Sequence, residues 1–122
     1  CVGAVSQGRA ALATPVNALE RDEDPQAVWR TYVNDQLDGP YQGLFARLHD
    51  LILLEAPSFE VVALWRAEQE AKLRARGAGG MDEAQVARFV AHYERLSRWI
   101  LAEMPGRADW VIPLDTERNP YV

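Results

Sequence analysis

Two short apolar runs in the chain predict β-strands. Residues 51–54 are four consecutive apolar residues, followed by Glu-Ala-Pro. A run of this kind is typical of a strand buried on both faces in a parallel sheet. Residues 108–115 contain a second apolar run with Pro113 near its end, and they predict a second buried strand. Residues 1–5 are small and apolar, and they predict the end of a further strand.

Helical spacing of apolar residues dominates residues 25–48. Asp24 and Pro25 combine a carboxylate at the N-cap with a proline at the first helical position, and they predict a helix start. The apolar positions that follow share one helical face: Val28, Trp29, Tyr32, Val33 and Leu37. A Gly-Pro pair at 39–40 ends this helix, and a second short helix is expected over 41–48. The acidic run 20–24 before it predicts a solvated loop.

Two longer helices are predicted between the two strands. Ser58 is expected to cap a helix that runs to about residue 76, where a glycine-rich break begins at residues 77–80. Asp82 and Gln85 predict a capping box at the start of a continuous helix that ends near residue 104. The order strand, helix, helix, strand predicts a helix-rich α/β architecture in one domain covering residues 1–122.

Composition agrees with a small globular domain and excludes some functions. The chain has 122 residues, of which 48% are hydrophobic and 25% charged. Its net charge of −5 argues against a nucleic-acid partner, because such binding needs clustered basic charge. No apolar run is long enough to cross a membrane. We therefore expect a cytoplasmic protein with neither a nucleic-acid nor a membrane partner.

Cys1 is the only cysteine, so no internal disulfide can form, and the chain begins without a methionine. Three interpretations of Cys1 remain open: the first residue of a processed lipoprotein, an exposed thiol nucleophile, or the point at which a longer chain was cut. The residues after Cys1 are small and apolar, unlike a polar lipoprotein tether. We therefore favour the cut over the other two interpretations.

The sequence contains no metal-ligand spacing, no Ser-His-Asp arrangement and no GxxxxGK[ST] loop. The helix expected after Ser58 is the one segment whose side chains suggest a catalytic role. Arg66, Gln69 and Glu70 share one face of the helix after Ser58, and Arg74 continues that face. Arginines on a helix that leads into a glycine-rich hinge are typical of lids in phosphoryl-transfer enzymes. Spacing alone favours a simpler interpretation, in which these residues form Arg–Glu pairs on an exposed helix. His49 and His92 are expected on helix surfaces.

The chain resembles one enzyme family along most of its length. The strongest motifs are Ala56-Pro57-Ser58-Phe59-Glu60, Trp65-Arg66, Gln69-Glu70, Met81-Asp82, Phe89-Val90 and His92-Tyr93-Glu94-Arg95. Weaker similarities are Cys1-Val2-Gly3-Ala4, Pro15-Val16-Asn17, residues 29–34, and residues 108–115 with Arg118 and Pro120. Together these motifs resemble the C-terminal half of the D-glycerate 3-kinase-like P-loop kinases, which are relatives of uridine and pantothenate kinases.

The resemblance implies a kinase that moves the γ-phosphoryl group of ATP, with Mg²⁺, onto a hydroxyl of D-glycerate or a similar metabolite. Residues 58–104 would then form the lid helix, its glycine-rich hinge and the following long helix. Arg66 and Arg74 are the candidate catalytic residues, and Arg66 is the choice for stabilising the transferred charge. The candidate substrate-binding residues are Asn17, Trp29, Tyr32, Asn34, Gln69 and Glu70. No metal ligand is expected within this chain.

The chain departs from the family where the nucleotide would bind. The Walker A strand and loop of such kinases would precede Cys1, and Lys72 cannot replace the Walker lysine because no glycine loop precedes it. We therefore expect a partial P-loop-type parallel sheet flanked by helices, which is inactive without a missing N-terminal half of the same protein. Without the Walker A strand, the parallel sheet would have a gap with unpaired backbone groups along the neighbouring strands. A fragment of this kind could also fill that gap by forming a homo-oligomer. The alternative is a non-catalytic α-helical interaction domain, in which the helix over 86–104 packs with a partner and Arg66 is solvated.

Overall fold

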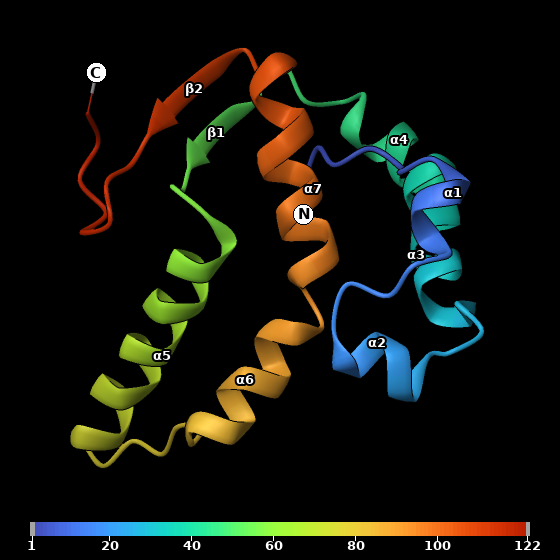
Figure 1. Ribbon diagram of the computed structural model, residues 1–122. Coiled ribbons are helices and arrows are strands. Elements are labelled where there is room, and N and C mark those ends of the chain that lie inside the picture. Colours follow the sequence, from blue (N-terminus) through green and yellow to red (C-terminus); the bar gives the residue numbers. More distant parts are fainter. Residues whose placement is uncertain (1, 122) are drawn as a thin grey trace.

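The computed structural model describes residues 2–121, which form seven α-helices, one 3-10 helix and two strands. The elements in chain order are α1 (Arg9–Leu12), α2 (Ala18–Glu23), α3 (Val28–Asp38), α4 (Pro40–Phe45), β1 (Ile52–Glu55), α5 (Phe59–Ala75), α6 (Glu83–Ala91), α7 (Glu94–Glu103), the 3-10 helix Met104–Gly106 and β2 (Trp110–Pro113). In Figure 1, α5 and the strands lie on the left, α6 and α7 run down the middle, and α1 to α4 lie on the right.

The two strands lie within the two predicted apolar runs and pair in parallel. Ile52 stands opposite Trp110, and Leu53 stands opposite Val111. Helices α5, α6 and α7 connect β1 to β2, as a parallel pair requires. The order strand, helix, strand is therefore as predicted, whereas the larger P-loop-type sheet remains a prediction.

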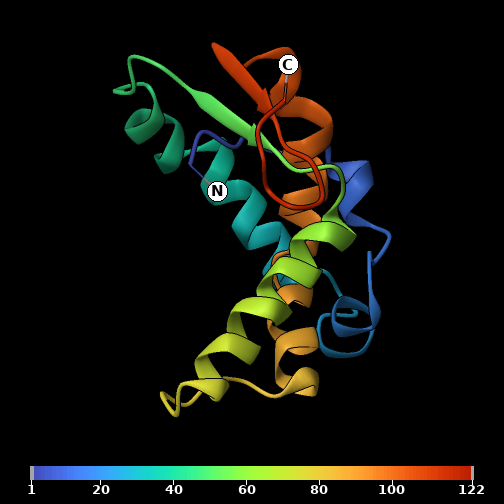
Figure 2. The same ribbon diagram turned by 90° about the vertical axis from the view of Figure 1, so that its left-hand side faces the viewer.

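The prediction that residues 51–54 are buried on both faces is wrong for this chain. Leu53 is 7% exposed, whereas Ile52 and Leu54 on the opposite face are 58% and 61% exposed. Among residues 2–121, β1 pairs with β2 alone, so its other edge has no neighbouring strand. Figure 2 shows the pair at the top of the molecule, above α5. The sheet thus has one uncovered apolar face, and no third strand among the residues described pairs with the outer edge of β1 or of β2.

The predicted strand end at residues 1–5 is not a strand in the described part, and Cys1 lies outside the described residues. Residues 2–3 form a turn, and residues 4–7 have no regular structure. The carbonyl oxygens of this segment accept hydrogen bonds from side chains of other elements: Gly3 from Arg107, Ala4 from Gln42, Val5 from Trp99 and Gln7 from Asn34. Side chains therefore satisfy backbone groups that a neighbouring strand would otherwise bind.

Helix α3 begins three residues later than predicted, and most of its predicted apolar face is exposed. The prediction of Asp24 as the N-cap is wrong, because the N-cap residue is Ala27. The Asp24 carboxylate nevertheless accepts hydrogen bonds from the backbone N–H groups of Trp29 and Arg30 in the first turn, at 3.0 and 3.1 Å. Val28 and Trp29 are 61% and 69% exposed. The buried residues are Arg30, Asn34 and Leu37, so Leu37 alone of the five predicted apolar positions is buried.

The acidic run 20–24 is largely helical rather than a solvated loop. Residues up to Glu23 belong to α2, whose N-cap Asn17 accepts a hydrogen bond from the Glu20 N–H at 3.0 Å. The Glu20 carboxylate is bound by Arg95, which lies 75 residues later in the chain. Because this contact is long-range, local composition could not indicate it.

The continuous helix predicted over 82–104 is divided into α6 and α7 at His92 and Tyr93. Its start is as predicted: the capping box of Asp82 and Gln85 is present. At the break, the Asn17 amide donates hydrogen bonds to the Ala91 carbonyl and to the Glu94 carboxylate, both at 2.9 Å. A side chain that binds a helix carbonyl in this way explains the interruption of the helix.

The chain has a small core and a large exposed surface. The buried apolar residues are Ala4, Leu12, Leu37, Leu53, Ala56, Phe59, Val86 and Met104. The exposed surface is 8121 Å². A compact monomer of 13.7 kDa exposes about 6,600 Å² by the usual scaling of area with mass. The excess of roughly 1,500 Å² is about twice what one partner contributes to a standard protein interface.

Candidate functional site

Helix α5 carries the predicted lid residues, and it forms because Ser58 caps its first turn. The Ser58 hydroxyl accepts a hydrogen bond from the Val61 N–H at 3.3 Å. Helix α6 returns beside α5 after the loop 76–82, and the two helices form a hairpin (Figures 1 and 2). The lid residues lie on the side of α5 that faces α6.

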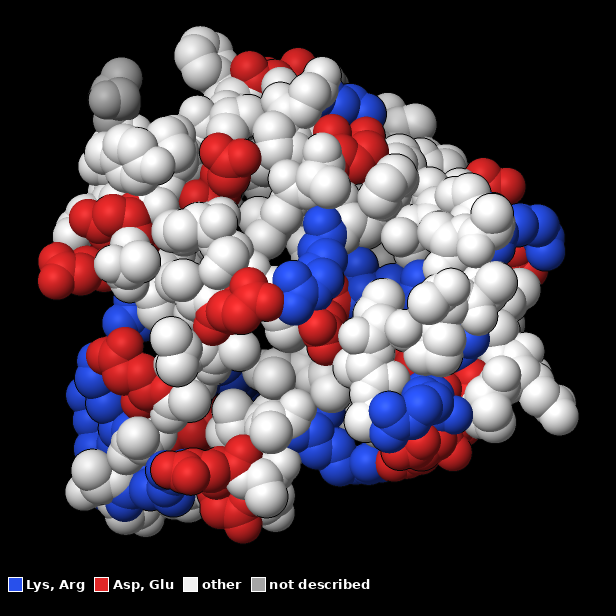
Figure 3. All heavy atoms as spheres, in the orientation of Figure 1, with Lys and Arg blue, Asp and Glu red and all other residues white. Residues whose placement is uncertain are grey.

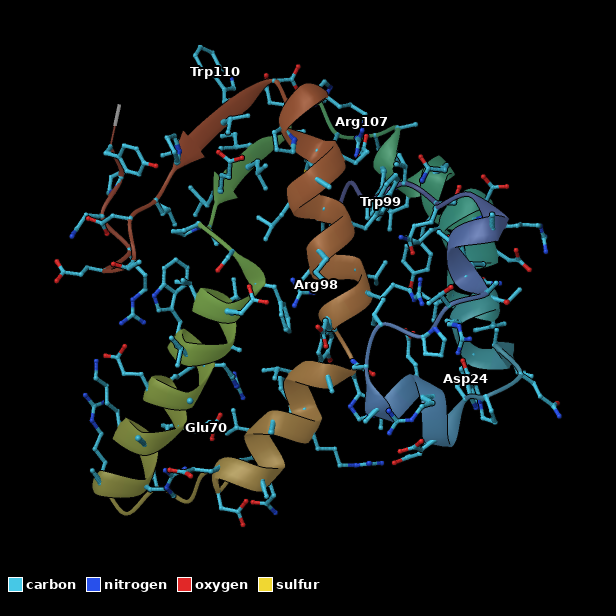
Figure 4. The ribbon with its side chains drawn as sticks, viewed as in Figure 1. Asp24, Glu70, Arg98, Trp99, Arg107 and Trp110 are labelled. Atoms are coloured by element: carbon cyan, nitrogen blue, oxygen red, sulfur yellow. The ribbon has the colours of Figure 1, made fainter. Side chains whose placement is uncertain are left out.

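Glu70 is the buried centre of the hairpin. It is only 3% exposed, and its side chain points from α5 toward α6 (Figure 4). One carboxylate oxygen lies 2.5 Å from Arg66 Nη2, and the other accepts a hydrogen bond from the Met81 N–H at 2.9 Å. Glu70 therefore joins two turns of α5 to the end of the loop that precedes α6.

Arg66 is held by its neighbours but retains one unused donor. Its Nη1 donates to Gln69 Oε1 at 3.2 Å, and its guanidinium carbon lies 4.8 Å from the centre of the Phe89 ring. Its Nε is the one buried side-chain nitrogen or oxygen without a hydrogen-bond partner among the residues described. A buried donor without an acceptor is rare in native proteins and calls for an explanation.

Arg74 fixes the glycine-rich turn. Its Nη1 donates to the Met81 carbonyl oxygen. Gly80 adopts φ +124°, and a side-chain Cβ there would lie 3.1 Å from the Glu70 carbonyl oxygen. The turn therefore requires glycine at this position and is anchored to α5.

The predicted acceptor residues lie on the other side of α6 and α7. Asn17 caps α2 and bridges to the helix break, as described above. Asn34 is buried and binds the backbone of Gln7 in both directions, at 2.7 and 3.1 Å. Trp29 and Tyr32 are exposed, with their rings in an edge-to-face contact. The side chains of Asn17 and Asn34 thus form hydrogen bonds that connect different segments of the fold.

A cleft of about 400 Å³ lies among α1, α2, α3 and the α6–α7 junction. Trp29 and Asn34 line it, whereas Tyr32 lines a neighbouring groove of about 460 Å³ on α3 and α4. Neither hollow is lined by a residue of α5. The structure therefore does not bring the lid residues and the acceptor candidates into one pocket.

Two buried arginines in the cleft wall were missed by the sequence analysis as site residues. Arg95 binds the Glu20 carboxylate with Nε at 2.8 Å and Nη2 at 2.7 Å, and it also donates to the Ala11 and Thr14 carbonyls. Arg30 donates to the Leu12 and Asp24 carbonyls. In the sequence, Arg95 was marked only by its place in the motif His92-Tyr93-Glu94-Arg95, and Arg30 only by lying in the weaker similarity over residues 29–34.

The buried pairs change the pKa of their carboxyl groups. Burial alone raises the pKa of Glu20, but the hydrogen bonds from Arg95 and Val16 and the charges of Arg95 and Arg30 together lower it below its ordinary value of 4.5. Asp24 follows the same pattern, because backbone hydrogen bonds and the charge of Arg30 outweigh its burial and lower its pKa below 3.8. Both groups are therefore ionised at neutral pH.

The charged side chains visible in Figure 3 are intermixed, with acidic and basic atoms next to each other over this face. Among residues 2–121 there is no group of three or more His, Cys, Asp or Glu side chains that could hold a metal ion. Lys72 pairs with Glu68 on the outer side of α5. No helix in the described part is both long enough and apolar enough to cross a bilayer.

Comparison with known proteins gives one relative. Over 62 residues the chain is 40% identical to a protein of Schizosaccharomyces pombe described as "Uncharacterized kinase mug58". About half of this chain is similar to part of a kinase. The match covers 51% of the chain and 22% of the relative, so the chain spans about a fifth of the length of the curated relative it matches. No family model matches the chain, and no solved structure matches it.

Proposed function

We propose that this chain is the lid-bearing C-terminal part of an ATP-dependent small-molecule kinase. The observation that carries the proposal is the similarity of half the chain to a protein described as a kinase. The acceptor that we propose, from the family resemblance, is a hydroxyl of D-glycerate or of a similar metabolite. The motifs Trp65-Arg66 and Gln69-Glu70 lie on α5, the helix that this proposal assigns to the lid.

The ATP and Mg²⁺ of such a reaction do not fit residues 2–121 alone. Lys72, the one lysine of the sequence, lies on the surface in an ion pair with Glu68. Residues 2–121 also contain no cluster of carboxylates arranged for a metal ion. We therefore assign the nucleotide and metal site to a missing N-terminal half of the same protein. By this proposal the chain by itself transfers no phosphoryl group.

The uncovered surface supports a larger assembly. The open edge of β1 can accept another strand, and the exposed face of Ile52 and Leu54 can be covered by a helix. The excess exposed area of roughly 1,500 Å² is large enough for such a contact. We propose that the same polypeptide supplies this cover.

Arg66 is the residue that we propose for phosphate charge. Its orphan Nε can donate to a phosphate oxygen, and its ion pair with Glu70 keeps the guanidinium in place. Because the Nε is buried under Phe89 and α6, a phosphate reaches it only when the α5–α6 hairpin opens.

The test is Arg66→Ala in the longer protein that contains this chain, assayed with ATP and D-glycerate. We expect kcat to fall about a thousandfold or more, because a charge-stabilising arginine contributes that much, while the KM for ATP changes less than about threefold. Arg76→Ala is the matched control, because Arg76 lies exposed just after the same helix. Turnover in Arg66→Ala equal to that of the control removes Arg66 from the mechanism.

A second candidate is a non-catalytic interaction domain, and one observation favours it. The exposed apolar face of α3, with Val28, Trp29 and Tyr32, is the kind of surface that binds a partner protein or a second copy of the chain. This candidate predicts that the longer protein consumes no ATP with any hydroxylated acceptor.

A further inference from the structure

Arg30 lies in the wall of the 400 Å³ cleft and has one guanidinium nitrogen that binds nothing. Its side chain is 4% exposed. Nε donates to the Leu12 carbonyl at 2.7 Å, and Nη1 donates to the Asp24 carbonyl at 2.6 Å. Within residues 2–121, Nη2 makes no hydrogen bond, although the residue lines the cleft. Nη1 also donates to the Asp24 carboxylate at 3.3 Å. These three bonds hold the guanidinium in position and leave the Nη2 amino group as a double donor for a ligand.

We propose that this cleft binds a monocarboxylic acid with an apolar body, and that the carboxylate accepts hydrogen bonds from Arg30 Nη2. The donor is already fixed by Leu12 and Asp24, so binding does not have to order a flexible side chain. A guanidinium edge is the group that proteins use most for a carboxylate.

The charges around the cleft favour one negative charge over two. Glu20, Glu23 and Asp24 line the same cleft. Each is paired with an arginine, Glu20 with Arg95, Glu23 with Arg88 and Asp24 with Arg30. The surroundings are therefore close to neutral, and the three carboxylates would repel a phosphate dianion more strongly than a carboxylate.

The remaining walls fit an apolar body. Leu12, Leu19, Val33 and Leu96 line the cleft together with the Trp29 ring. Its volume of about 400 Å³ is within the range of small-molecule sites in proteins. A ligand of this kind can place its carboxylate at Arg30 and its hydrocarbon part against these side chains.

Two of the acceptor candidates, Trp29 and Asn34, line this cleft, but the inference rests on Arg30 and needs neither ATP nor the lid residues of α5. Direct binding to the 122-residue chain tests it. The probe is 3-phenylpropanoate, titrated by NMR while the Trp29 indole N–H and the Val33 amide are followed. We expect saturable shifts at these groups and binding at least about tenfold weaker for the uncharged 3-phenylpropan-1-ol.

Inorganic phosphate is the second arm of the titration. We expect it to bind at least about tenfold more weakly than the acid at the same groups. Equal binding of the acid and the alcohol, equal or tighter binding of phosphate, or no saturable shift with the acid overturns the proposal.

Two substitutions at Val33 give the decisive comparison. Val33 lines the cleft but is 41% exposed, so a charge there does not have to be buried. Val33→Glu is expected to weaken binding of the acid at least about tenfold through repulsion, and Val33→Trp to do so by filling the cleft. Val28→Glu is the matched control, since Val28 is 61% exposed on the same helix and does not line the cleft. Unchanged affinity in both Val33 variants, or an equal loss in Val28→Glu, contradicts the site.

Discussion

Glu70 illustrates at the residue scale how much of the α5–α6 hairpin depends on one carboxylate. Its spacing from Arg66 predicted an exposed helical pair, and the ion pair is present. The sequence could not predict that Glu70 is buried, because its second partner is the Met81 backbone 11 residues away across a turn. The same limit applies to Asn34 and Arg30, which are buried by contacts with the first 24 residues of the chain.

We expect Glu70→Ala to lower the free energy of unfolding by about 2–3 kcal/mol, because it leaves Arg66 Nη2 and the Met81 N–H without partners in a buried place. Glu68→Ala on the same helix is the control, since Glu68 forms only exposed pairs with Lys72 and Arg118. That change should cost less than about 1 kcal/mol. Urea unfolding of both variants measures the difference, and equal costs would show that the hairpin does not depend on Glu70.

Glu20 gives the protein a pH dependence whose sign follows from its lowered pKa. The folded state holds the pKa of Glu20 below 4.5, so the unfolded state binds a proton first as the pH falls. The stabilisation is therefore complete at neutral pH and decreases below about pH 4.5 as Glu20 protonates. We expect Glu20→Gln to be less stable at pH 7 and to lose less stability between pH 5 and pH 3, measured by urea unfolding at each pH. Parallel pH profiles in the two proteins would contradict this assignment.

At the scale of elements, locally encoded features were predictable and long-range ones were not. The runs 51–54 and 108–115 specify the two strands, and Ser58, Asp82 and Gln85 cap the helices as expected. The break between α6 and α7 was not predictable, because the apolar stripe continues through it and the cause is Asn17, 74 residues earlier. The exposure of most of the apolar face of α3 was not predictable either, since helical spacing shows which residues share a face but not whether anything covers that face.

Asn17 has two separable roles, as the cap of α2 and as the bridge to the break. Asn17→Ser retains a capping oxygen but removes the amide that binds Ala91 and Glu94. We expect it to destabilise the protein by about 1–2 kcal/mol and to speed hydrogen exchange at residues 91–95. Asn17→Ala also removes the cap and should cost about 1 kcal/mol more. If Asn17→Ser leaves exchange at the break unchanged, the bridge does not cause the interruption.

At the scale of the whole molecule, the chain exposes more surface than its mass requires. Ile52, Leu54 and Trp110 on the strand pair are each more than half exposed, and Trp110 points away from the rest of the molecule in Figure 4. The sequence predicted the parallel strands and a sheet that is only partial. It could not predict the uncovered face, because an apolar run has the same pattern whether its cover is in the same chain or elsewhere.

The central claim is that another part of a longer polypeptide covers β1. Hydrogen exchange at the backbone amides of β1 (Ile52–Glu55) tests it most directly, in the 122-residue chain and in the protein purified from its own cells. The account predicts fast exchange in the chain alone and strong protection in the cellular protein, where a neighbouring strand and a covering helix occupy the open edge and face. Equal exchange rates of these amides in the two proteins would contradict the claim.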